Sequence, residues 1–498
     1  MTKTATPPEF DIQLHRPGQR PKRIGFFGIS MKATVYGVIG LLVGMVLWMF
    51  ANPWVGAVVV LGTVLALTPM VIAPGGRSLY ERLEHRMRWF GRKLDGSTVY
   101  RPGPHGRVPD GLYKLPGILT GTTLHMGRDY LGNEFGIIHR RTGDQYTVVL
   151  DCYPGGDEAL TQSQRDLMTA DWGAYLAGLG LPGDIVLASV TVEDVPATGQ
   201  RLALEVQQDI ANSPSELATA VMQQSAIQFP AGKQQIFARL AITFKARTKE
   251  HRTEPEEMAT DLARRLPALY EDLAGAGVEA VPLSAEEITA FVHRSYDPSA
   301  EPLLEQLDIA GEPHGIAWEN AGSATRTEWD HIRHAGAVSV VWEMQAPPIA
   351  VFPDTILKPL LRPHDELPRK RLTLFFRPFS AGDAAKSVNR EYKDALNALN
   401  QKKGVKNAND ELRVEATEQA RNEQVRGAGL VQYSALMTVT VDSMDALPTA
   451  TSIHDALTAR ASLNVRRCFG FQDAAFAACL GVGVNLADHS TISSLGKN

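Results

Sequence analysis

The expected structure of the N-terminal part depends on one stretch, ATVYGVIGLLVGMVLWMFANPWVGAVVVLGTVLALTPMVIAPGG, which runs from Ala33 to Gly76. It holds no Asp, Glu, Lys or Arg. A helix that crosses the hydrocarbon core of a bilayer needs about 20 mostly apolar residues, so the stretch has room for two crossings. Asn52-Pro53 should break the helix between them, because proline restricts the preceding residue and supplies no backbone donor. We therefore predict a transmembrane hairpin with spans over residues 33–50 and 54–73.

The alternative is a pair of buried core helices in a soluble protein. Core helices usually carry a polar face, and neither segment has one. Trp48 and Trp54 stand near the ends of the spans, where the interface of a bilayer favours aromatic side chains. Gly40 and Gly44 form a GxxxG pattern, which allows close packing within the hairpin or against a neighbouring helix. We expect both tryptophans to face lipid.

Basic residues flank the two outer ends of the hairpin, and the turn between the helices carries no charge. Positively charged flanks stay on the cytoplasmic side of a membrane. The flanking cations are Arg16, Arg20, Lys22, Arg23 and Lys32 before the hairpin, and Arg77, Arg82, Arg86, Arg88, Arg92 and Lys93 after it. The expected location is therefore the plasma membrane, with two spans and with both termini in the cytoplasm.

Composition limits the class of protein. The chain has 498 residues, of which 44% are hydrophobic, and a formal net charge of −5. A nucleic-acid-binding protein would usually be basic, so no direct nucleic-acid contact is expected. The three cysteines, Cys152, Cys468 and Cys479, form no CxxC pair, which argues against a disulfide framework or a zinc site and suits a reducing compartment.

Strands alternate with helices after the hairpin, so the expected fold class is α+β, with mixed α/β cytoplasmic domains preceded by the two-helix transmembrane hairpin. Ser284 and Glu287 form a capping box for one of the helices. The expected division is a flexible lead (1–30), the hairpin (31–76), a basic amphipathic helix with a linker (77–110), a first α/β domain (111–296), a linker (297–327) and a second α/β domain (328–498).

An amphipathic helix is expected over Ser78–Leu94, where apolar residues recur at helical spacing among five basic residues. Directly after a span, such a helix would lie along the inner leaflet, and each Lys or Arg near anionic lipid contributes about 1 kcal/mol. Arg82, Arg86 and Arg88 are the candidate lipid contacts. The alternative is that the helix packs against the cytoplasmic domain.

A second candidate surface lies on a predicted helical hairpin over Asp383–Gln401 and Asn409–Val425. Tyr392, Leu396 and Leu399 fall on one stripe of its first helix, whereas the second helix has few apolar residues to bury. Helices of this kind gain most of their stability from packing. The stripe therefore faces either the parent sheet or a protein partner.

No catalytic, cofactor or metal residue is predicted. The chain has no GxxxxGK[ST] loop, no GxSxG and no HExxH, so it is not expected to be an enzyme or to hydrolyse ATP. Gly481-Val482-Gly483 lacks the third glycine of a dinucleotide fingerprint. His331 and His334 are interpreted as part of an exposed polar helix, with a metal-binding pair beside Glu328 and Asp330 as the alternative. The basic run of Arg362, Arg369, Lys370 and Arg371 is interpreted as a solvated, charge-balanced edge, with phosphate binding as the alternative.

The sequence also contains an internal echo. A strand ending in Val149–Pro154 is followed by Gly156-Asp157-Glu158-Ala159 and a helix, and the strand Leu374–Pro378 is followed by Gly382-Asp383-Ala384-Ala385 and a helix. A duplicated strand–turn–helix–strand unit would explain this echo, and so would convergence of short junctions.

Several segments together resemble an actinobacterial integral membrane protein family found with conjugative, type IV-like transfer systems. They follow the two-span hairpin in this order: Gly76–Glu81, Tyr100–Pro104, Leu115-Pro116-Gly117, Thr147–Cys152, Trp172–Gly180, Ser295–Pro298 and Gly470–Phe476. The hairpin is similar to the PrgI-type subunit. The rest resembles the non-motor domain of VirB-type conjugative ATPases, where a segment like GFQDAAF leads towards a motor that is missing here.

The resemblance implies a membrane-anchored, non-catalytic structural component of a conjugative transfer apparatus that docks a separate motor ATPase. Its expected partners are the lipid bilayer, the ATPase and other subunits, with a homo-oligomer left open. Two alternatives remain: a component like EccE of type VII secretion, which has a similar layout, and a membrane-tethered enzyme with an unrecognised active site.

Overall fold

The structure is a computed structural model, and it describes ten segments of the chain. These are residues 31–50, 52–71, 79–103, 114–156, 160–212, 215–228, 234–346, 353–401, 408–425 and 429–489. The described chain forms two compact units, one up to Thr98 and one from Val99 onward. The expected flexible lead over residues 1–30 lies outside the described residues.

The smaller unit contains three helices, α1 (Met31–Phe50), α2 (Pro53–Val71) and α3 (Leu79–Leu94). Asn52 starts α2, because its side-chain Oδ1 accepts a hydrogen bond from the Trp54 amide at 2.9 Å. α1 and α2 pack together as a hairpin. The helix pair expected from the apolar stretch is therefore present, with its turn at the expected residue.

The prediction that this hairpin is transmembrane is wrong as a description of the fold. Among the residues that the structure describes, no helix is both long enough and apolar enough to cross a membrane. The expected plasma-membrane location with cytoplasmic termini stays a prediction.

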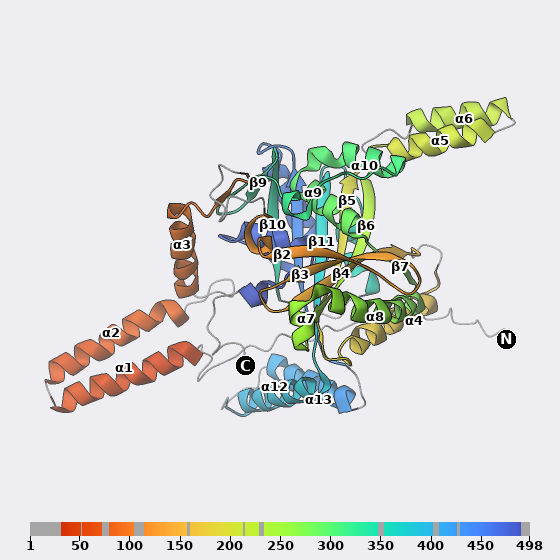
Figure 1. Ribbon diagram of the computed structural model, residues 1–498. Helices are drawn as coiled ribbons and strands as arrows, with labels where there is room; N and C mark the ends of the chain where they lie inside the picture. Colours follow the sequence, from red (N-terminus) through yellow and green to blue (C-terminus); the bar gives the residue numbers. More distant parts are fainter. Residues whose placement is uncertain are drawn as a thin grey trace, which may run out of the picture. The chain divides into compact units, whose positions relative to one another are not determined.

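The larger unit is built on a sheet of 13 antiparallel strands (Figure 1). The strands are β1 (Val99–Tyr100), β2 (Thr122–Arg128), β3 (Glu134–Arg140), β4 (Gln145–Pro154), β5 (Ile185–Pro196), β6 (Gln234–Lys245), β7 (Val278–Pro282), β8 (Thr325–Thr327), β9 (Ile332–His334), β10 (Ala337–Ala346), β11 (Arg369–Pro378), β12 (Val431–Val441) and β13 (Asn464–Arg467). Their order is β1-β8-β9-β10-β12-β11-β5-β6-β4-β3-β2, with β13 on β10 and β7 on β4.

The sheet consists of two halves with the same connections. In the first half, the chain order β4, β5, β6, β7 gives the spatial order β7-β4-β6-β5; in the second, β10, β11, β12, β13 gives β13-β10-β12-β11. Each is a split β-α-β unit of the ferredoxin-like kind. The halves join where β5 pairs with β11. We call this pairing the seam.

The larger unit also contains α-helices. They are α4 (Gln162–Gly178), α5 (Gln200–Asn212), α6 (Glu216–Gln228), α7 (Lys249–Thr253), α8 (Pro255–Gly275), α9 (Ala285–Tyr296), α10 (Glu301–Ala310), α11 (Lys358–Leu361), α12 (Ala381–Gln401), α13 (Ala408–Val425), α14 (Leu447–Arg460) and α15 (Gln472–Cys479). Short 3-10 helices lie at Gly117–Leu119, Pro298–Ala300, Trp318–Asn320, Asp354–Leu357 and Leu486–His489. Ser284 and Glu287 form the predicted capping box at the start of α9.

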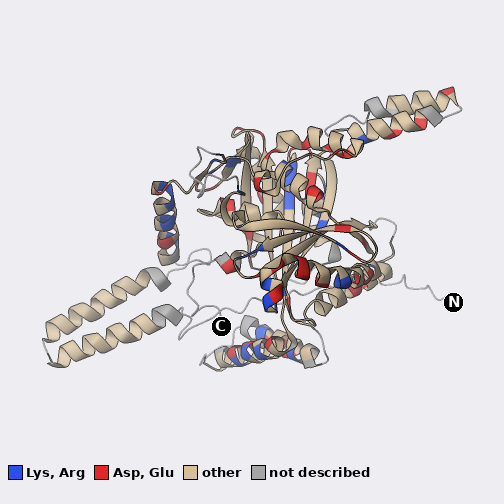
Figure 2. Cartoon of the chain, in the orientation of Figure 1, with Lys and Arg blue, Asp and Glu red and all other residues tan. Residues whose placement is uncertain are grey.

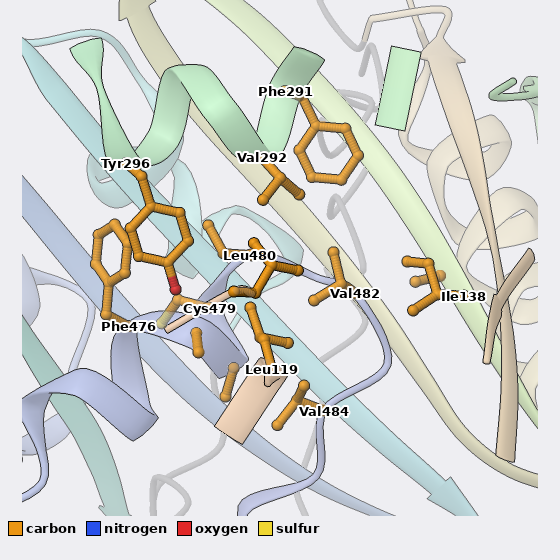
Figure 3. Close-up of a cluster of buried hydrophobic side chains, with 14 of the residues drawn as sticks. Leu119, Ile138, Phe291, Val292, Tyr296, Phe476, Cys479, Leu480, Val482 and Val484 are labelled. Atoms are coloured by element: carbon orange, nitrogen blue, oxygen red, sulfur yellow. The ribbon is translucent and has the colours of Figure 1, made fainter. Parts of the chain in front are cut away.

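Three apolar cores result from the alternation of side chains along the strands. α4 and α8 cover one face of the first half, and α11 and α14 cover one face of the second. α9 and α15 contribute to a third core that includes residues of both halves. Figure 3 shows Tyr296 and Phe476 meeting in this core, with their ring centroids 5.2 Å apart. These cores therefore stabilise the sheet by burying apolar side chains on both of its faces.

The internal echo in the sequence matched strands that do not correspond. It aligned β4 with β11, yet β4 is the first strand of its half and β11 is the second of the other. The strand after β4 in the chain is not its neighbour in the sheet, whereas β12 pairs directly with β11. The structural correspondence is instead β4 with β10 and β5 with β11.

Each half also carries a helical hairpin between its second and third strands. In the first half this hairpin is α5–α6, and in the second it is α12–α13, which is the hairpin predicted from the sequence. Figure 1 shows both hairpins projecting from the sheet, and α5 is linked to α10 by the ion pair of Arg201 with Asp308. They occupy equivalent places in the two halves.

Candidate functional site

The first candidate surface is the apolar stripe of α3. Leu83, Met87, Phe90 and Leu94 recur at helical spacing and are 57%, 59%, 58% and 72% exposed. This spacing places them on one face of the helix, with Arg82, Arg86 and Lys93 along one flank. Figure 2 shows the basic residues gathered on α3 and no charge on the described parts of α1 and α2. An exposed apolar stripe beside cations is typical of a helix that lies on an anionic lipid surface.

The three predicted lipid contacts on α3 are all exposed: Arg82, Arg86 and Arg88. Arg88 forms an ion pair with Glu84 one turn earlier, at 2.6 Å. The exposed pair contributes little stability on its own. The role of these three arginines as lipid contacts stays a prediction.

Trp48 and Trp54 are also exposed, at 55% and 80% of their surface. Glycines bring the two helices of the hairpin close together. A Cβ atom at Gly44 would come within 2.5 Å of the Val60 side chain, and one at Gly56 within 2.7 Å of the Gly44 carbonyl oxygen. The GxxxG glycines thus serve packing inside the hairpin, one of the two uses left open by the sequence.

The stripe on α12 lies partly against its neighbour α13. Tyr392, Leu396 and Leu399 are half-buried, and the Arg421 guanidinium lies 5.2 Å from the centre of the Tyr392 ring. Ala395, on the same helix, is only 1% exposed. The sequence analysis expected the stripe of α12 to face either the parent sheet or a protein partner. Contact with α13 was not among these expectations. The part of the stripe left exposed stays a candidate docking surface.

A group of charged side chains is buried inside the large unit, around Glu193 of β5. Its Oε2 accepts from Arg239 Nη1 at 2.9 Å, and its Oε1 accepts from Arg371 Nη2. Arg371 Nη2 also donates to Ser295 Oγ at 2.7 Å. The Arg239 guanidinium lies 4.4 Å from the centre of the Phe291 ring. Glu193, Arg239 and Arg371 are each less than 9% exposed.

A second carboxylate lies next to this group. Glu301 pairs with Arg294 through Oε1 at 3.2 Å and with Arg369 through Oε2 at 3.5 Å. We call the two carboxylates and their four arginines the arginine cluster: Glu193, Arg239, Arg371, Glu301, Arg294 and Arg369. Its members come from β5, β6, α9, α10 and β11, so the cluster reaches across the seam.

Burial and the neighbouring charges shift the pKa values of Glu193 and Arg239 in opposite directions. Burial alone would raise the pKa of Glu193, but Arg371, Arg239 and Arg294 outweigh it and hold the pKa below its usual range. Burial lowers the pKa of Arg239, and Glu193 opposes that change.

Beside the cluster, Lys370 pairs with Asp194 at 3.0 Å. Burial lowers the pKa of Lys370 and raises that of Asp194.

The interpretation of Arg369, Lys370 and Arg371 as a solvated edge is therefore wrong. These residues lie on β11 in the middle of the sheet, and each cation faces an acidic partner. The register pairs Lys370 with Asp194 and Arg371 with Glu193 across the seam. The sequence held a signal for this pairing, because Glu193-Asp194 and Lys370-Arg371 are complementary charge pairs within two β-type runs.

The GFQDAAF segment, Gly470–Phe476, contributes buried side chains to the apolar core. Gln472 is fully buried, and its amide accepts from the Val341 N–H at 2.8 Å and donates to the Val341 carbonyl at 3.2 Å. Val341 lies between the part of β10 that pairs with β9 and the part that pairs with β13. The side chain of Gln472 thus bonds to the strand where the ladder is interrupted. Sequence reasoning missed this role.

Gly481 and Gly483 also have a structural use. A Cβ atom at Gly481 would lie 2.5 Å from Thr191 Oγ1, and one at Gly483 would lie 2.7 Å from Thr243 Oγ1. Their φ angles are +73° and +77°, a region that favours glycine. The two glycines let the chain after α15 pass directly over the threonines of the sheet.

His331 and His334 do not lie on a helix, so that prediction is wrong. His334 is in strand β9 and 2% exposed, with one ring nitrogen 2.8 Å from the Tyr296 carbonyl and the other 2.7 Å from Ser339 Oγ. His331 precedes β9 and lies 2.9 Å from Asp330. Both ring nitrogens of His334 are thus engaged within the protein. The described residues contain no group of three or more His, Cys, Asp or Glu side chains placed to hold a metal ion.

Residues 22–81 match a family described as a domain of unknown function (DUF8461). The match covers the apolar helix pair and the first residues of α3, a small part of the chain. No curated protein matches the sequence.

Proposed function

We propose that this chain is a membrane-associated, non-catalytic structural component of a conjugative, type IV-like transfer apparatus, and that a separate motor ATPase docks on it. The observation that carries the first part is the exposed apolar stripe of α3 beside its cations. An apolar stripe of four large side chains is costly in water, and anionic lipid would cover it while neutralising the arginines.

The apolar helix pair supports the same location. Trp48, Trp54 and most other large side chains of α1 and α2 are exposed in the isolated chain. In water, each such side chain left exposed forgoes about 1.5 to 3 kcal/mol of burial free energy. A lipid bilayer is the cover that accommodates this much apolar surface without a matching protein groove.

Docking of the ATPase is supported by the resemblance to the non-motor domain of conjugative ATPases and by the two helical hairpins. α5–α6 and α12–α13 extend from equivalent places on a continuous sheet. A rigid sheet that presents two arms suits a scaffold, because arms fixed to a shared core keep a defined spacing.

The proposal is tested in the organism's own transfer system. Deleting the chain should abolish DNA transfer between cells in a mating assay, and the ATPase should no longer sediment with membranes. Complementation with the full chain should restore both. Normal DNA transfer in the deletion strain would refute the proposal, and a loss confined to protein secretion would favour the type VII alternative.

Recruitment is then tested with purified components. Vesicles rich in phosphatidylglycerol, loaded with the full chain, should bind the motor ATPase of the same transfer system. Vesicles without the chain should bind less ATPase. Equal ATPase binding to both preparations would contradict the docking role.

A further inference from the structure

The arginine cluster encloses a small cavity on the seam. Its volume is about 10 Å³, and its lining includes Glu193, Arg294, Ser295, Arg371 and Thr438. A cavity of this size holds about one water-sized occupant. Phosphate, sulfate and carboxylate ligands are too large for it. The occupant is therefore either a single water molecule or a monatomic ion.

The charge around the cavity favours an anion. Glu193 is shared by Arg239 and Arg371, and Glu301 is shared by Arg294 and Arg369. Each group of three therefore has one positive charge in excess. The neighbouring pair of Lys370 and Asp194 is balanced and does not offset this excess. Buried charge that lacks a counterion is strongly unfavourable.

Unused hydrogen-bond donors point to the same conclusion. Among the described residues, nothing accepts a hydrogen bond from Arg371 Nε or Nη1, or from Arg294 Nε. Both side chains line the cavity, and that of Arg371 is 7% exposed. A guanidinium has five N–H donors and no acceptor. A halide accepts from several N–H groups at once and brings the negative charge that offsets the excess of arginines.

We propose that a single chloride ion binds in this cavity, held by the unused N–H groups of Arg371 and Arg294. Glu193 and Arg239 belong to the first half of the sheet, and Arg369 and Arg371 to the second. The ion would therefore help to join the halves at the seam. The site is independent of the proposed role in transfer.

The test is thermal unfolding of the purified full chain, titrated with sodium chloride against sodium gluconate at constant ionic strength. Chloride should raise Tm by several degrees, and the rise should saturate at millimolar concentration. General salt effects do not saturate in this way. Equal Tm values in the two salts would overturn the proposal and assign the cavity to water.

Two variants locate the effect. Arg371→Gln should abolish the chloride-dependent rise, and Arg128→Gln should keep it, because Arg128 is an exposed residue paired with Glu134 on β2 and β3. If Arg371→Gln fails to fold, Arg294→Gln replaces it. A chloride-dependent rise that persists in folded Arg371→Gln or Arg294→Gln protein would overturn the proposal.

A direct readout is available from crystals soaked in bromide. A bromide ion has an anomalous X-ray signal, and water has none. A peak against Arg371 and Arg294 would support the site. The absence of a peak in the cavity, with peaks only at surface residues, would overturn it whatever the outcome of the transfer experiments.

Discussion

Thr191 and Thr373 lie directly opposite each other across the seam, with their hydroxyl oxygens 3.2 Å apart. One belongs to β5 and the other to β11, the corresponding strands of the two halves. The Thr373 hydroxyl also donates to the Cys479 carbonyl at 2.8 Å, which ties the end of α15 to the seam. The centre of the sheet is thus polar on this face, and the chain after α15 lies over it.

The first prediction concerns the glycines above these threonines. Gly481→Ala and Gly483→Ala should each lower the free energy of unfolding by about 2 to 4 kcal/mol, since a positive φ costs about 1 to 2 kcal/mol and overpacking about 1 to 3. Urea unfolding of the full chain measures the change. Gly132→Ala is the matched control, because Gly132 has a φ of +90° with open space around it. Its cost should be near 1 kcal/mol, and equal costs at all three sites would contradict the close approach.

A second prediction concerns the stability of the folded protein at acidic pH. Burial lowers the pKa of His334 to about 4 and that of His454 to about 3, so both are neutral in the folded protein. The unfolded chain, with a His pKa of about 6.5, takes up these protons first as the pH falls. Stability is therefore fully present above about pH 6.5 and declines towards pH 4. Each histidine should remove about 2 kcal/mol between pH 7.5 and pH 5.

His454 allows this to be tested by substitution. Its ring stacks on Trp342 with the centroids 3.9 Å apart, and neither ring nitrogen has a hydrogen-bond partner among the described residues, although Nδ1 lies 3.8 Å from Asp455 Oδ1. His454→Phe keeps the stacking and removes the titrating group. The variant should lose less stability than the parent chain when urea unfolding is compared at pH 7.5 and pH 5. An unchanged pH dependence would show that His454 is already protonated or exposed.

Glu193 is the subject of a third prediction. Glu193→Gln leaves two buried arginines without their shared carboxylate, so it should lower the free energy of unfolding by about 3 to 5 kcal/mol. Arg371→Gln in the same chain should recover part of the loss, because it removes one of the two unpaired charges. A double-mutant cycle by urea unfolding measures the coupling between the residues. Strictly additive effects would argue against their pairing.

Charge reversal on α3 gives a fourth prediction. Arg82→Glu with Arg86→Glu should weaken binding of the full chain to phosphatidylglycerol vesicles by at least about tenfold, because each cation near anionic lipid contributes about 1 kcal/mol. Vesicle flotation measures the binding. Lys386→Glu with Lys393→Glu on α12 makes the same change in net charge and should have little effect. Similar losses in both pairs would indicate that overall charge, and not α3, controls the binding.

The fifth prediction separates packing from docking on α12. Leu396→Glu with Leu399→Glu should leave the sheet folded, because the hairpin forms an insertion between β11 and β12, and should abolish ATPase binding. Circular dichroism and pull-down of the purified ATPase report the two effects. Asn397→Ala, at an exposed position of the same helix, should leave both unchanged. Unfolding of the whole chain by the double change would make the stripe part of the core.

Local elements were largely predictable from the sequence. The apolar helix pair, the amphipathic helix α3, the capping box at Ser284 and the hairpin of α12 and α13 all follow from periodicity and capping residues. These features depend on contacts within one helix or between neighbouring helices. The apolar run predicted the helix pair correctly, but the prediction that this pair spans a membrane is wrong.

Long-range pairing was not predictable in the same way. Arg371 looks like a surface residue until Glu193 is placed opposite it, and no local pattern supplies that register. The sequence around Gln472 does not predict that its side chain forms hydrogen bonds with Val341 of β10. His334 was assigned to a helix because two histidines three residues apart fit a helical face, whereas the short strand β9 is fixed by its pairing with β10.

The seam has a consequence for synthesis of the chain. Thr191 and Thr373 are 182 residues apart, so at about 5 to 20 residues per second β5 waits on the order of 10 to 40 s for β11 to leave the ribosome. During that interval β5 is an open edge of a half-made sheet. Such an edge recruits strands from other nascent chains unless charged side chains oppose it. Glu193 and Asp194 stand on that edge, so the carboxylates that later pair with Arg371 and Lys370 first act as gatekeepers against aggregation.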